Sequence, residues 1–114
     1  MRKHQIENAA YEVATQVRTV EDSIDTALVE IAELQARMMR ASSIAATGYG
    51  TIHPALQQLA TAVAGLIDTR GAILGCHAAL AEAKQKVPGL RTVSWGDGDE
   101  CPPAGGRADL RVVA

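Results

Sequence analysis

Apolar residues recur with a strict seven-residue period through the first third of the chain. Steps of four and three residues, taken alternately from Ile6, meet an apolar side chain at ten consecutive positions: Ile6, Ala10, Val13, Val17, Val20, Ile24, Ala27, Ile31, Leu34 and Met38. Glu, Arg, Asp and Thr fill most of the outer positions. This pattern is typical of a long helix that packs against another helix along a narrow stripe. It predicts an all-α chain.

Two glycines divide the chain into two helices. The first helix is predicted over about 4–46, and a turn over 47–51 contains Gly48 and Gly50. Pro54 fits best in the first turn of a helix, so the second helix is predicted over about 52–86, ending before Pro88. Helices of similar length with so short a link should fold back as an antiparallel, coiled-coil-like hairpin over 1–87. One continuous kinked rod is the alternative, and the paired glycines disfavour it.

The second helix carries a wider apolar stripe than the first. One seven-residue series is apolar throughout, and the series beside it becomes polar at Arg70, His77 and Lys84. A third series widens the stripe on one side with Ala60, Ile67, Leu74 and Ala81. Because the first helix can cover only a narrow stripe, a second partner is implied.

We therefore expect self-association through the second helix. Burying an aliphatic side chain stabilises a protein by roughly 1.5–3 kcal/mol, a large amount for a two-helix structure. A dimer that forms a four-helix bundle, or a trimer of hairpins, would cover the stripe. The predicted interface consists of Leu59, Leu66, Ile67, Ile73, Leu74 and Leu80.

The polar residues within the stripe should set the register of the two helices. In an antiparallel hairpin that turns near Tyr49, Arg70 falls within reach of Asp25 or Glu30, and His77 falls opposite roughly Glu21 and Asp22. Pairing with acidic residues is a better explanation for Arg70 and His77 than chemistry, because no other catalytic or ligating pattern accompanies them.

The remaining segment, 88–114, has a different character. Residues 90–95 and 109–113 are β-prone, and a Gly, Asp and Pro rich loop separates them. The segment is predicted to be an extended arm or a small β-hairpin, with an unstructured tail as the alternative. Since two strands alone are marginally stable, an ordered arm would have to pack against the helices, a neighbouring subunit or a client protein.

Composition argues against several classes of partner. The 114 residues carry a net charge of −2, with 11 scattered Lys and Arg residues and only 3% aromatic residues. These values disfavour nucleic-acid binding and an anionic membrane surface. The apolar stretches around 59–67 and 71–81 are interrupted by Asp68 and Arg70, so neither reaches the roughly 18 uninterrupted residues of a spanning helix.

No candidate for catalysis or cofactor binding emerges from the motifs. Cys76-His77 is a ligand-type pair, but a metal site needs three or four converging ligands, and no such spacing is present. We expect no catalytic, cofactor-binding or metal site, and no enzyme. The start MRKHQIENAA has no apolar signal-peptide core, and the two cysteines are too few for a disulfide framework, so a cytoplasmic protein is expected, or a virion protein if a phage encodes it.

In outline, the chain resembles the small helical-hairpin secretion substrates of the Trp-x-Gly type. The resemblance covers the length and the helix-turn-helix order, and it implies dimerisation into a four-helix bundle. The turn here is Gly48-Tyr49-Gly50 without the Trp-x-Gly motif, and no tyrosine-based export signal follows the second helix. The resemblance therefore extends to no specific residue.

The sequence favours a non-catalytic, homo-oligomeric helical-hairpin protein that acts as a structural or assembly component. A bacterial or phage particle is a natural setting for such a component. Two alternatives remain: a small chaperone or adaptor that binds a partner helix through the second helix, and, less favoured, a metal-binding bundle. The last would need inward-facing Glu and His residues on several helices, and the apolar stripe of the first helix has none.

Overall fold

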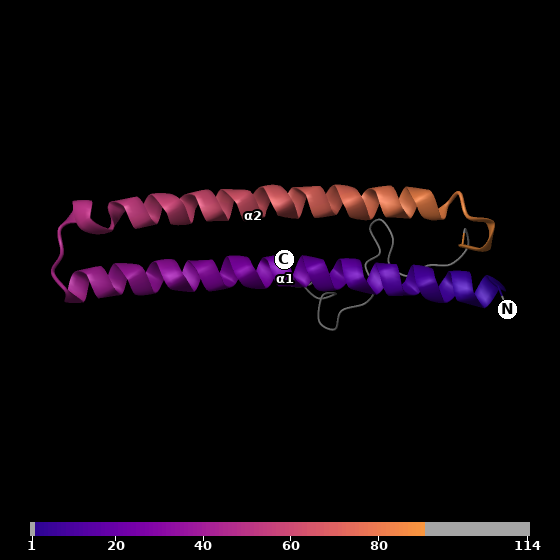
Figure 1. Ribbon diagram of the computed structural model, residues 1–114, viewed down its shortest axis with the longest axis horizontal. Coiled ribbons are helices and arrows are strands. Elements are labelled where there is room, and N and C mark those ends of the chain that lie inside the picture. Colours follow the sequence, from indigo (N-terminus) through magenta and orange to yellow (C-terminus); the bar gives the residue numbers. More distant parts are fainter. Residues whose placement is uncertain (1, 91–114) are drawn as a thin grey trace, which may run out of the picture. The chain divides into compact units, whose positions relative to one another are not determined.

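The computed structural model describes residues 2–90, and these residues are helical almost throughout. Helix α1 spans Arg2–Ile44, helix α2 spans Tyr49–Lys84, and a short 3-10 helix, η1, spans Pro88–Leu90 (Figure 1). The prediction of an all-α chain is confirmed for this part. Residues 91–114, with the predicted extended arm, lie outside the described residues.

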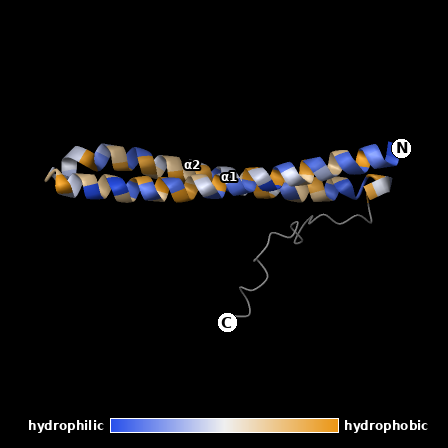
Figure 2. Ribbon diagram, turned by 90° about the horizontal axis from the view of Figure 1, so that it is seen from below, coloured by the Kyte–Doolittle hydropathy of each residue, from blue (hydrophilic) through white to orange (hydrophobic). Residues whose placement is uncertain are grey.

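The described chain divides into two compact units that share both long helices. Unit 2 is Val20–Ala72, and unit 1 combines the beginning of the chain up to Thr19 with the segment that starts at Ile73. Within unit 2, the end of α1 and the start of α2 lie side by side and run in opposite directions (Figures 1 and 2). Unit 2 is therefore an antiparallel helical hairpin, as the sequence predicts.

α1 ends in a tight turn that closes on a residue other than glycine. Its backbone bonds are those of a Schellman motif: Ala46 N donates to Ser43 O at 3.2 Å, and Thr47 N donates to Ser42 O at 3.2 Å. The motif places Ala46 in the left-handed region, with φ at 55°. The hydroxyl groups of Ser42 and Thr47 add a bond of 2.9 Å across the turn. The turn thus begins before the glycines that predicted it.

Helix α2 begins at Tyr49, earlier than the expected start at residue 52. Its first turn is tight, with Thr51 N donating to Gly48 O at 3.1 Å. The early start leaves Pro54 in the second turn of the helix, whereas the sequence suggested the first. Because proline has no N–H, the carbonyl of Gly50 lacks its usual helical partner there. Gly50 is exposed, so water can bond to this carbonyl instead.

Neither unit contains a substantial core. Among residues 2–90, only Ile24 in unit 2 and Leu90 in unit 1 are buried, at 8% and 5% exposure. The remaining apolar residues of the helix pairs are half-buried or exposed. When the ribbon is coloured by hydropathy, apolar residues recur along both helices (Figure 2). A single chain therefore leaves much of its apolar surface in contact with water.

Candidate interaction surface

The predicted interface residues of α2 fall into two groups by exposure. Leu59 and Leu66 in unit 2, and Ile73 in unit 1, are half-buried. Leu80 in unit 1 is exposed, at 37%. Ile52 of the same seven-residue series is half-buried as well, and so are Leu56 and Val63 of the neighbouring series. Up to Leu66, these two series therefore form the more covered side of α2. In unit 2, Leu59 and Leu66 therefore lie on the side of α2 that α1 covers.

Ile67 and Leu74 form the second group. Their exposed fractions are 55% and 54%, although both are large aliphatic residues. They lie seven residues apart, which is two helical turns, so they share one side of α2. Within a single chain this side of α2 is left uncovered.

The two predicted apolar series of α1 are covered unequally, which the sequence did not reveal. The series through Val17, Ile24 and Ile31 is half-buried or buried. In the other, Val13 and Leu34 are exposed, whereas Val20 and Ala27 between them are half-buried. A series on the opposite flank is half-buried as well: Ala14, Glu21 and Leu28. One helix covers only a narrow stripe, and apolar periodicity alone does not say which flank that stripe includes.

An ion pair between Arg70 and Asp25 crosses the hairpin of unit 2. The Nε of Arg70 donates to Oδ1 of Asp25 at 2.8 Å, and both side chains are about half exposed. This bond and the charge of Asp25 raise the pKa of the Arg70 guanidinium, and the charge of Glu21 raises this pKa a little further. The expectation that Arg70 lies within reach of Asp25 or Glu30 is confirmed, with Asp25 as the partner.

The pairing of His77 with Glu21 or Asp22 stays a prediction. His77 lies in unit 1, whereas both acidic residues lie in unit 2. His77 is half-buried, and Cys76 beside it is exposed with a free thiol. Within residues 2–90 there is no group of three or more His, Cys, Asp or Glu side chains placed to hold a metal ion.

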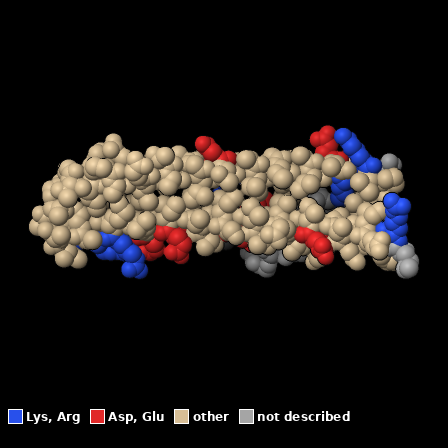
Figure 3. Space-filling model, in the orientation of Figure 1, with Lys and Arg blue, Asp and Glu red and all other residues tan. Residues whose placement is uncertain are grey.

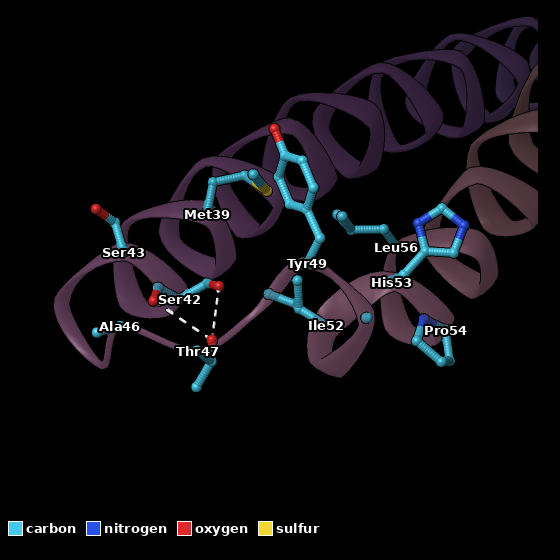
Figure 4. A pocket seen from close by; sticks show the side chains of 11 residues that line it. Met39, Ser42, Ser43, Ala46, Thr47, Tyr49, Ile52, His53, Pro54 and Leu56 are labelled. Atoms are coloured by element: carbon cyan, nitrogen blue, oxygen red, sulfur yellow. Dashed lines mark hydrogen bonds between the residues drawn. The ribbon is translucent and has the colours of Figure 1, made fainter.

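An open hollow of about 810 Å³ lies at the turn of unit 2. Its apolar walls come from both helices and include Met39, Tyr49, Ile52 and Leu56 (Figure 4). Ser42, Ser43, Thr47 and His53 supply polar groups, and Ala46, Gly50 and Pro54 complete the lining. The lining contains no Lys, Arg, Asp or Glu. No sequence pattern indicated this hollow, because its walls come from two helices that only the turn brings together.

α2 is also long and apolar enough to cross a membrane by length and composition alone. The sequence predicted no membrane-spanning helix because only uninterrupted apolar runs were considered, and these are interrupted by Asp68 and Arg70. A helix-length window tolerates two charged residues, and most of this window is exposed. The composition of α2 alone therefore does not say whether lipid or protein covers this helix. The charges of α1, which lies beside α2 in unit 2, bear on that question.

Comparison with known proteins adds no relative. No protein-family model, curated protein or solved structure matches this chain.

Proposed function

We propose that the protein is a non-catalytic, homo-oligomeric helical-hairpin protein that acts as a structural or assembly component, for example of a bacterial or phage particle. One observation carries the proposal: among residues 2–90, each unit buries a single residue, while large apolar side chains of α2 remain half exposed. Folding must outweigh a large loss of chain entropy, and burial of apolar surface is the main favourable contribution. Association of several copies supplies the missing burial.

A protein partner explains the surface of α2 better than a lipid bilayer does. In unit 2, α1 lies alongside α2, and its outer positions carry Glu30, Glu33, Arg37 and Arg40. Glu33 pairs with both arginines at 3.9 Å. A membrane around α2 would have to accept these charges as well, at a cost of several kcal/mol. In a helix bundle, α1 can face water while α2 faces its partner.

Replacement of Ile67 and Leu74 by Lys tests the proposal. If copies associate through this side of α2, the double variant places unpaired charges in an interface, at a cost of several kcal/mol. Light scattering should then report the mass of a single chain, and circular dichroism should report a partial loss of helix. The matched control replaces Tyr11 and Val29, which are exposed apolar residues of α1, by Lys. An unchanged mass and melting temperature in the α2 variant would refute the proposed interface.

A small chaperone or adaptor is the second candidate, and the exposed side of α2 is the observation that favours it. An amphipathic helix from another protein could lie on Ile67 and Leu74 in place of a second copy. The same measurement separates the two candidates. A wild-type chain that is monomeric and stably folded would support the adaptor, whereas a stable homo-oligomer supports the structural component.

A further inference from the structure

The middle of α2 contains the longest run of exposed residues within α1 or α2. Residues 67–72 are all exposed, whereas between Ile52 and Leu66 every third or fourth residue is half-buried. We call residues 67–72 the exposed segment, and it lies wholly within unit 2. The run arises because the position that continues the covered side of α2 is Arg70 rather than an apolar residue. Packing on α1 therefore contributes little to the local stability of this segment.

Two glycines weaken the helix at the same place. Gly65 lies just before the exposed segment, and Gly71 lies within it. A side chain at either position would meet open space, and neither backbone is left-handed. Glycine inside a helix is less stable than alanine, because it loses more conformational freedom on folding. The two glycines therefore lower the local stability of α2 without serving a close approach within the chain.

The side chain of Thr69 weakens the helix further. Its hydroxyl donates to the carbonyl of Gly65 at 2.9 Å, and this carbonyl is also the helical acceptor for the N–H of Thr69. A back bond of this kind slightly destabilises a helix and favours a bend. Exposure, glycine and the Thr69 bond thus coincide on about two turns of α2.

An ion pair joins the exposed segment to α1. The Nε of Arg70 donates to Oδ1 of Asp25 at 2.8 Å. Arg70 is the only Lys or Arg residue of α2 within unit 2. Figure 3 shows that charged side chains are sparse on the face it draws. If the pair breaks, α2 has no second Lys or Arg residue in this unit to replace it.

We propose that α2 opens locally at the exposed segment in the native protein, and that the Arg70–Asp25 pair restrains this opening. The hairpin of unit 2 then has two states, one with α2 continuous through residues 65–72 and one with the helix interrupted there. Because both side chains of the pair are about half exposed, salt screens their attraction and favours the open state. Ionic strength therefore sets the balance between the two states. This property belongs to the hairpin itself and does not depend on the proposed self-association.

Amide hydrogen exchange of the full-length protein, resolved by residue, tests the opening. The rate of exchange reports the fraction of time for which each part of the helix is open. In the wild type, amides of the exposed segment should be at least about tenfold less protected than those of residues 56–63, an earlier stretch of the same helix in the same unit. G71A should slow exchange of the exposed segment about three- to fivefold. The matched control G50A makes the same change at an exposed glycine of α2 outside the segment, and it should leave exchange of the segment unchanged.

D25N and salt test the role of the ion pair in the same measurement. D25N should speed exchange of the exposed segment about two- to fivefold, with little change at residues 56–63. About 1 M NaCl should bring the wild type close to D25N, because salt screens the pair that the variant lacks. E33Q is the control, since it removes the charge that Arg37 and Arg40 share elsewhere on α1. It should leave exchange of the exposed segment unchanged.

Two results would overturn the inference. Equal protection of the exposed segment and of residues 56–63 in the wild type would show that α2 does not open there. An equal effect of D25N on both stretches would show that the pair stabilises the whole hairpin and does not restrain a local opening. Circular dichroism checks that the variants fold, as the exposure of the substituted residues implies. Failure of the proposed self-association is distinct, because light scattering would then report the mass of one chain while the difference in exchange between the two stretches remains.

Discussion

Ala46 occupies a backbone conformation that suits glycine. A left-handed residue with a Cβ costs about 1–2 kcal/mol. Glycine removes this cost, but its greater freedom in the unfolded chain offsets part of the gain. A46G should therefore raise the free energy of unfolding by about 0.5–1 kcal/mol, measured by chemical denaturation. The control A41G, inside α1, should lower it by about 0.5–1 kcal/mol. Equal effects of the two changes would contradict the left-handed assignment.

The Arg70–Asp25 pair supplies a second prediction at this scale. D25N should lower the melting temperature, because Arg70 loses its charged partner. Addition of R70L should cause no further loss, since leucine restores an apolar residue to the series. E30Q is the control: Glu30 is the other acidic residue that the sequence placed near Arg70. The effect of D25N should shrink in about 1 M NaCl, because salt screens a half-exposed pair.

The pH dependence of this pair follows from the raised pKa of Arg70. A basic group with a raised folded-state pKa contributes stability that is present below its unfolded pKa. That stability is lost as the pH rises through the folded pKa, which for arginine is strongly alkaline. Titration of Arg70 should therefore not change the free energy of unfolding between about pH 6 and pH 10.

At the scale of the elements, Pro54 weakens the start of α2. It lies in the second turn, where an N–H would otherwise bond to the carbonyl of Gly50. P54A should restore this bond and raise the free energy of unfolding by about 1 kcal/mol, well below the full cost of an interior proline because the site is near the helix end. Chemical denaturation measures the change. A loss of stability would indicate that Pro54, which lines the open hollow at the turn of unit 2, is needed there for packing.

At the scale of the whole molecule, sparse burial makes stability depend on association. With only Ile24 and Leu90 buried among residues 2–90, a single chain should be marginally stable. The melting temperature should therefore rise with protein concentration, because partners bind the folded chain and not the unfolded one. Scanning calorimetry over a roughly hundredfold range of concentration measures this. A constant melting temperature, together with the mass of one chain, would show that the hairpin is stable alone.

The sequence by itself determined the helices, the hairpin of unit 2 and the pairing of Arg70 with an acidic residue. These features follow from local periodicity, from turn residues and from the equal rise per residue of two antiparallel helices. It also singled out Ile67 and Leu74 as residues that lie beside the covered stripe of α2.

Tertiary structure alone decided three other features. The covered stripe of α1 includes Leu28 and leaves Leu34 exposed, because the rotation of a helix about its axis depends on its partner. The turn closes on Ala46 rather than on Gly48, because the backbone bonds of the Schellman motif stabilise that conformation. The open hollow at the turn of unit 2 exists because the fold brings Met39 and Leu56 together. Periodicity within a single helix carries no information about which residues of two helices meet.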